Sequence, residues 1–314
     1  MTACPTCGHD GAGAGGVYLF RDVREDETEN LRAQVKDNPA LRPLISALRG
    51  RLAIEDRAAA DAERIIREVF DGVVAALREV DGSTRRGALT RQAILTASLA
   101  DLAKLLGPAL DEARTRVEQA YREMLETNRD LAAAAAQIPA GTLGIRTSSL
   151  DALIGGAAAD FWSGKVAMPA ASIIREGLKS AMTGETLNTA IDRVAKQLDT
   201  SAGKAATEVR TNLGTFDRLA AEESASAAGL DLRVYLGPLD SLTRPFCRAL
   251  INRAFTLEHV AELDNGQTGP GLWGGGGYNC RHRWVAVRAP MLERLRIPLG
   301  TDADIERANT AGAR

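Results

Sequence analysis

Aromatic side chains are scarce in this sequence, at 4% of 314 residues, whereas alanine and leucine crowd the first two thirds of the chain. A β-sandwich needs many Tyr, Phe, Val and Ile residues, so this composition predicts a mainly helical protein. No apolar run approaches the roughly 18 to 20 residues of a membrane-spanning helix, and the N-terminus lacks a basic stretch followed by an apolar one. We therefore expect neither a membrane span nor a secretion signal.

Charge and cysteine content exclude two further classes of protein. The 39 Lys and Arg residues are balanced by 41 Asp and Glu residues, so no overall basic field favours sequence-independent binding of nucleic acid. Four cysteines are too few for a disulfide scaffold. Their small number indicates synthesis in a reducing compartment, where a cysteine pair is considered first as a set of metal ligands.

Hydrophobic periodicity predicts a mainly α protein with a small C-terminal α+β module and long antiparallel N-terminal helices. The expected segments are a flexible arm with a CxxC motif (1–25), a helical hairpin or bundle (26–140) and a shorter helical part (141–229). The α+β module (230–290) and a C-terminal tail (291–314) follow.

Proline and glycine positions predict where several helices begin and end. Pro43 and Pro108 each fit the first turn of a helix, where the missing N–H costs little. Two separate helices are expected over 187–198 and 202–228, and Gly229 would end the second.

Residues able to carry chemistry lie between two predicted strands, 230–237 and 283–287. Two of the three histidines and two of the four cysteines fall in this interval: Cys247, His259, Cys280 and His282. Thiolate and imidazole donors suit tetrahedral Zn²⁺, which would staple a small domain. The predicted ligands are Cys247, Cys280 and His282, and the candidates for a fourth ligand are His259, Asp240, Cys4 and Cys7. A Cys247–Cys280 disulfide and simple burial of both thiols are the alternatives.

The N-terminal CPTCGH motif is only half of a zinc-ribbon pattern. Its missing half could be Cys280 and His282, but we favour the interpretation that the Cys4/Cys7 pair holds no metal.

Catalytic motifs are missing from the sequence. It contains no GxSxG, HExxH or GxxxxGK[ST] pattern, and the four glycines before Tyr278 lack the strand-then-helix context of a phosphate loop. We therefore do not expect an enzyme. The alternative hypotheses are a zinc- or thiol-dependent enzyme built on Cys247, Cys280 and His282, and a DNA-binding protein.

Four motifs in order resemble the Mu F-like phage head morphogenesis family, whose members are minor head proteins. They are RTN (Arg210–Asn212), DSLTRPFCRAL (Asp240–Leu250), NGQ (Asn265–Gln267) and GGGGYNCRHRWVAV (Gly274–Val287). The resemblance covers about 164–289. Asn212 stands where the family usually has Glu, and no Pro follows His282 or Trp284, as it often does in the family.

The resemblance implies a non-enzymatic minor capsid protein that is made in the host cytoplasm and resides in the virion near the capsid or portal. Its expected partners are the portal or the major capsid protein, and several copies of the chain are expected per virion. It is also a candidate for packaging and ejection with the DNA. No membrane contact is expected before infection.

Within the α+β module, the resemblance also suggests roles for individual residues. Tyr278 and Trp284 would pack the module, and Cys280 with His282 would lock the last strand against the turn that contains Asp240 and Thr243. Arg281 and Arg283 become candidates for contact with a partner protein or packaged DNA, and simple solvation of both is the alternative.

Overall fold

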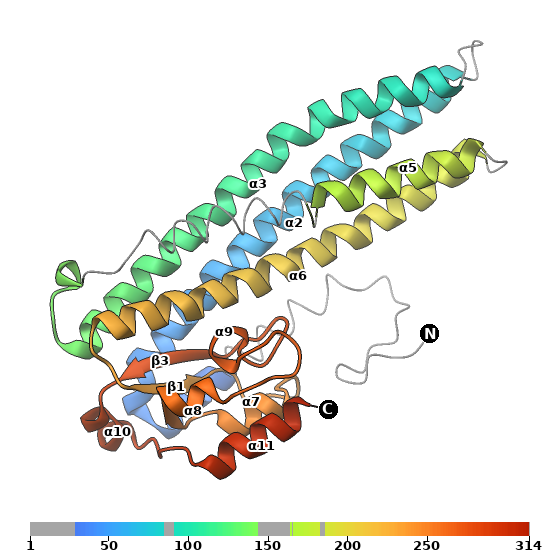
Figure 1. The fold of residues 1–314 in the computed structure, drawn as a ribbon. Coiled ribbons are helices and arrows are strands. Elements are labelled where there is room, and N and C mark those ends of the chain that lie inside the picture. The colour runs from blue at the N-terminus through green and yellow to red at the C-terminus, as the bar shows by residue number, and fades with distance from the viewer. Residues whose placement is uncertain (1–28, 85–90, 144–163, 165, 183–185, 314) are drawn as a thin grey trace. The chain divides into compact units, whose positions relative to one another are not determined.

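The computed structural model describes residues 29–84, 91–143, 164, 166–182 and 186–313. Long helices dominate these residues, and a three-stranded antiparallel sheet lies in the C-terminal part, as Figure 1 shows. This arrangement confirms the predicted fold class. None of the helices in these ranges combines the length and apolarity needed to cross a membrane.

Four helices make up most of the chain before the sheet: α2 (Arg42–Thr84), α3 (Arg91–Ala136), α5 (Met168–Met182) and α6 (Leu187–Ala227). Pro43 lies in the first turn of α2, as predicted. Gly229 follows α6 with φ 63°, the left-handed conformation in which glycine commonly ends a helix. Short 3₁₀ turns span Pro39–Leu41 and Ala140–Thr142.

Two predicted helix limits are wrong. Pro108 lies inside α3 rather than at the start of a new helix, because a helix this long tolerates the one backbone hydrogen bond that proline removes. The two helices expected between 187 and 228 form the single helix α6. The intervening residues, Asp199, Thr200 and Ser201, are compatible with a continuous helix and do not break it.

The chain forms two compact units. Unit 1 contains 1–55, 121–147 and 211–314, and unit 2 contains 56–120 and 148–210. Helices α2, α3 and α6 each contribute residues to both units. The units are therefore not successive segments of the chain, in contrast to the predicted division.

Unit 2 is helical among its described residues. The α2 residues Ile65, Ile66, Val69 and Val73 are buried, as expected from their spacing on one helix face. Charged side chains occupy the other face, where exposed pairs such as Arg64 and Glu68, 3.0 Å apart, contribute little to stability.

The sheet belongs to unit 1 and has the order β2–β1–β3. Strand β1 is Leu232–Leu236, β2 is Ala254–Thr256 and β3 is Arg283–Val287. Val234 of the central strand lies opposite Ala254 on one side and Val285 on the other. Both strands predicted from alternating apolar residues are therefore present and are paired directly with each other.

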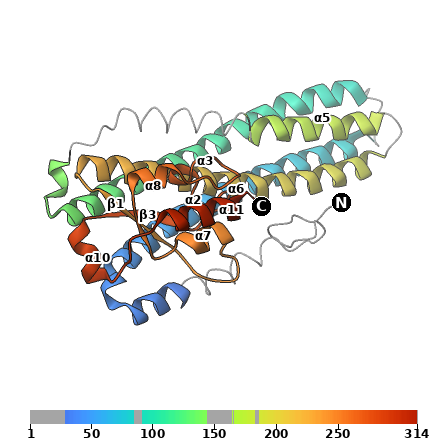
Figure 2. The same ribbon diagram turned by 60° about the horizontal axis from the view of Figure 1, so that its bottom comes forward.

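Both faces of the sheet are buried within unit 1. One face contacts the start of α2, through Leu44, Ile45 and Leu48, and helix α10 (Ala289–Leu295), which lies beside the residues preceding α2 in Figure 2. The other face packs against four short helices: α7 (Pro245–Leu250), α8 (Leu257–Ala261), α9 (Gly271–Gly274) and α11 (Asp302–Gly312).

The last part of the chain is not a tail. Helix α11 begins with a capping box at Thr301 and buries Ile305 and Ala308 in the same core as Trp284. The sheet is also not a self-contained module over 230–290, because residues of α2 and α10 cover one of its faces. The alternating pattern identified the residues of each face but not the segments that cover them.

Candidate metal centre

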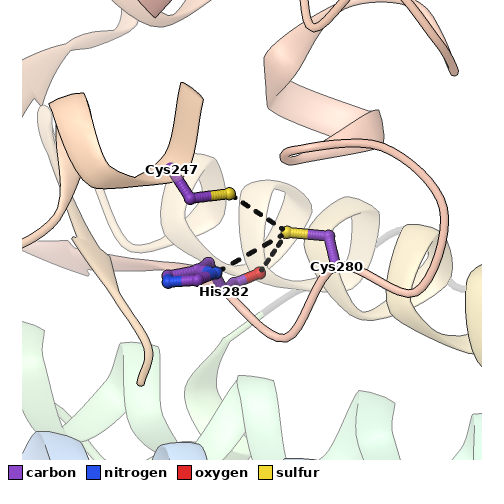
Figure 3. A group of neighbouring side chains, drawn as sticks. All are labelled: Cys247, Cys280 and His282. Carbon is purple, nitrogen blue, oxygen red and sulfur yellow. Dashed lines mark hydrogen bonds between the residues drawn. The ribbon is translucent and has the colours of Figure 1, made fainter. Parts of the chain in front are cut away.

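Cys247, Cys280 and His282 converge inside unit 1. Cys247 lies in α7, and the other two residues precede β3. Their donor atoms all lie within 4.8 Å of one another, with 3.8 Å between the two sulfurs and 3.9 Å between Cys280 Sγ and His282 Nδ1. Figure 3 shows the three side chains pointing toward one another. The sequence-predicted ligand set is thus brought together by the fold, and this buried group could hold a metal ion.

The turn before α7 positions Cys247. Asp240 Oδ1 accepts a hydrogen bond from the backbone N–H of Leu242, and the Thr243 hydroxyl donates to the carbonyl of Pro238. Arg281 then holds both carboxylate oxygens of Asp240 at 2.7 Å. Because Arg281 stands between Cys280 and His282, this bidentate pair ties the segment with two of the donors to the turn that positions the third.

The glycine-rich segment allows the backbone to pass beside the sulfurs. Gly275 and Gly277 have φ values of 53° and 98°, which other residues rarely adopt. A Cβ at Gly276 would overlap Cys247 Sγ. The backbone N–H of Gly276 donates to Cys280 Sγ at 3.1 Å. The glycines therefore provide both the sharp turn and a hydrogen-bond donor to a sulfur.

The hydrogen bonds of His282 define its tautomer. Its Nε2 lies 2.9 Å from the carbonyl oxygen of Pro238, which can only accept, so Nε2 carries the proton. In the neutral ring Nδ1 then has a free lone pair facing Cys280 Sγ, whereas a protonated ring would donate from Nδ1 to that sulfur. A metal-binding histidine typically donates its second N–H to a carbonyl or carboxylate in this way.

The two thiols differ in acidity. The hydrogen bond from Cys247 holds the pKa of Cys280 well below its usual value against the effect of burial, and His282 and the charge of Arg218 act in the same direction. The same pairing, together with burial, raises the pKa of Cys247. The lowered pKa of Cys280 favours its thiolate, which is the form that binds metals.

The two described candidates for a fourth ligand, Asp240 and His259, are not in this group. Asp240 is engaged by Arg281, and His259 Nε2 lies 3.0 Å from Asp302 Oδ1. Cys4 and Cys7 lie outside the described residues. The two described cysteines are free thiols rather than a disulfide.

The other predicted site residues differ in how far they are buried. Trp284 is buried and donates its indole N–H to the carbonyl of Gly271 at 3.1 Å. Tyr278 does not pack the core: 48% of it is exposed, because the turn through Gly277 directs it outward. Arg281 is mostly covered by its pairing with Asp240, and Arg283 is fully buried. The expectation that Arg283 is on the surface is therefore wrong.

Sequence reasoning missed a buried charged network around Arg283, which consists of Arg51, Glu55, Asn128, Asp217 and Arg283. Arg283 pairs with Glu55 and, at 2.9 Å, with Asp217. Asp217 also lies 3.4 Å from an Arg51 nitrogen and accepts from Asn128 at 2.7 Å. Charged residues on long helices usually face solvent, and no local pattern distinguishes these from the others.

Arg283 connects this network to the metal-binding segment. Its Nη1 donates to the backbone carbonyls of Cys280 and His282 at 2.5 and 2.9 Å. The conformation of the segment that carries two of the donors thus depends on an arginine whose counter-charges come from α2 and α6.

Comparisons of the chain with protein-family models, with curated proteins and with solved structures give no match.

Proposed function

We propose that the protein is a non-enzymatic minor head protein of the Mu F-like kind, which binds the portal or the major capsid protein during assembly of a phage head. We further propose that a zinc ion held by Cys247, Cys280 and His282 closes the C-terminal part of unit 1.

One observation carries this proposal: the four motifs behind the family resemblance are joined to one another. The backbone N–H of Asn279 donates to Thr211 Oγ1 at 3.3 Å, and Asn265 donates to the Gly275 carbonyl at 3.0 Å. Arg281 binds Asp240, and the sulfurs of Cys247 and Cys280 are 3.8 Å apart. The motifs therefore behave as one structural set, although they are separated by many residues in the sequence.

The same contacts support a structural rather than a catalytic role. Cys247, Cys280 and His282 are at most 6% exposed, so solvent barely reaches the sulfurs. The charged motif residues Asp240, Arg281 and Arg283 are engaged in internal pairs. Neither the thiol-enzyme alternative nor DNA binding through these arginines is favoured by any contact among the described residues.

The donor set fits zinc. Tetrahedral Zn²⁺ with Zn–S distances of about 2.3 Å separates two thiolate sulfurs by about 3.8 Å, and the sulfurs of Cys247 and Cys280 are 3.8 Å apart. A disulfide would require an S–S distance of about 2.05 Å. When bound, zinc would crosslink α7 to the segment before β3, and His282 is held in the required tautomer by Pro238.

The assembly role can be tested in the phage that encodes the chain, by quantitative mass spectrometry of purified particles. We expect several copies per particle, fewer than the copies of the major capsid protein. Gly276→Ala, which places a methyl group against Cys247, should abolish incorporation. Gly203→Ala, whose Cβ meets open space, should retain it. Particles that lack the protein yet assemble and package DNA normally would contradict the proposal.

A further inference from the structure

The proposed zinc site has three donors, whereas structural zinc sites are four-coordinate. The residues that the sequence offered as a fourth ligand are occupied elsewhere, as Asp240 and His259 are, or lie outside the described residues. The site is buried, so the remaining position must be filled from the surrounding side chains or by trapped water. Any assignment of the fourth ligand rests on the proposed zinc site.

Tyr235 places its hydroxyl against the sulfurs. It lies in the central strand of the sheet, β1, and is fully buried, with its ring packed on Trp284 and stacked beside His282. Its oxygen lies 3.4 Å from Cys247 Sγ and 3.6 Å from Cys280 Sγ. Among the described residues, these two sulfurs are the only partners of the hydroxyl.

These distances match one face of a zinc tetrahedron. With Zn–S of about 2.3 Å and Zn–O of about 2.0 Å, tetrahedral geometry gives S–S of about 3.8 Å and S–O of about 3.5 Å. The observed triangle has sides of 3.8, 3.4 and 3.6 Å. The phenol oxygen and the two sulfurs are thus already spaced as donors to one ion.

One more anion would also help to balance the buried charges around the site. Zn²⁺ with two thiolates is neutral, and in the adjacent network Arg51 and Arg283 are balanced by Glu55 and Asp217. That leaves Arg218, which is buried against Gly275. It donates to the carbonyls of Gly214 and Trp273, and its Nε has no partner among the described residues.

No carboxylate pairs with Arg218 in the part of the chain that the structure describes. An unpaired buried guanidinium is costly, and a phenolate ligand beside it would bring the local charge to zero.

We propose that Tyr235 Oη is the fourth zinc ligand, coordinating as a phenolate whose proton is released to solvent, so that the site is a closed Cys₂–His–Tyr centre. The opposing view is that the Tyr235 hydroxyl only donates a hydrogen bond to a thiolate. The two views differ in whether tyrosine becomes ionised when the metal binds and in whether loss of the hydroxyl opens a coordination position.

The experiment is a titration of the full-length, metal-free protein with Zn²⁺, followed by ultraviolet difference spectroscopy for ionised tyrosine. The chain has four tyrosines, so a variant with Tyr18, Tyr121 and Tyr278 all changed to Phe retains only Tyr235. We expect one tyrosinate per bound zinc in both the wild type and this triple variant. This result does not depend on whether Tyr235 itself can be replaced.

A second measurement uses Tyr235→Phe, with Tyr121→Phe as the control because Tyr121 is also buried and packs on Phe216. Tyr235→Phe should weaken Zn²⁺ affinity by more than the roughly 10- to 100-fold typical of losing an outer-shell partner. It should also let thiocyanate shift the visible spectrum of the Co²⁺-loaded protein. Tyr121→Phe should do neither.

The outcomes separate the two proposals. If the wild type binds one zinc without a tyrosinate signal, or if Tyr235→Phe binds zinc within a few-fold of wild type, Tyr235 is not a ligand and the three-donor site stands. If the wild type takes up no zinc, the zinc site itself is refuted, and the role of Tyr235 falls with it.

Discussion

Replacing Asp217 by asparagine would test the buried network that anchors Arg283. The carboxylate of Asp217 is 0% exposed and serves both Arg51 and Arg283. Asparagine has nearly the same shape and can still accept from the Asn128 amide, which now donates to Asp217 at 2.7 Å. The substitution therefore removes the charge while leaving most of the packing in place.

The expected loss follows from the charge count. With Asp217 present, two arginines face two carboxylates, whereas in the variant Arg51 and Arg283 share Glu55 alone. Breaking a buried ion pair by removing one partner costs about 3–5 kcal/mol, because the other charge stays buried without compensation. We expect the free energy of unfolding to fall by an amount in this range.

The assay is urea unfolding followed by tryptophan fluorescence, since Trp273 and Trp284 lie in the same unit as Asp217. The double variant Arg51→Met/Asp217→Asn restores neutrality and should recover at least about 1 kcal/mol relative to Asp217→Asn alone. A single-variant loss below about 1 kcal/mol, or a double variant less stable than the single one, would refute the reasoning.

Two further predictions concern a backbone position and a helix cap. Gly276→Ala should lose metal binding and destabilise unit 1 by about 1–3 kcal/mol, since its methyl group overlaps Cys247 Sγ. Gly203→Ala in α6 should instead stabilise the helix by about 0.5–1 kcal/mol. Zinc uptake and urea unfolding measure both variants. Burial alone would raise the pKa of Asp304, but hydrogen bonds from Thr301 outweigh it and lower that pKa. Asp304 therefore contributes its full stabilisation of the folded state above its pKa in the unfolded chain, about 3.9. This stabilisation is lost as the pH falls through the lower pKa of Asp304 in the folded state. Unfolding curves between pH 5 and pH 2 should show this loss in the wild type and not in Asp304→Asn; identical pH profiles would contradict it.

Local patterns in the sequence were sufficient for the main elements and for three members of the site. Alternating apolar residues located β1 and β3, and the rarity of cysteine and histidine made Cys247, Cys280 and His282 conspicuous. These inferences succeed because strand periodicity and donor chemistry are properties of single residues and short segments.

What the sequence could not supply is the identity of partners far along the chain. Arg283 looked like a surface residue beside Arg281, yet its counter-charges are Glu55 and Asp217, which come from two long helices. Nothing in a helix rich in alternating charges marks which carboxylate will be buried. Tyr235 was likewise only one residue of a predicted strand until the fold placed its hydroxyl beside both sulfurs.

Zinc analysis of the purified full-length protein tests the central claim most directly. Elemental analysis combined with X-ray absorption at the zinc edge should find one zinc per chain, bound by two sulfurs and two lighter donors, and Cys280→Ser should lose it. Protein that was purified with zinc in the medium but contains none, or whose mass shows a Cys247–Cys280 disulfide, would contradict the account.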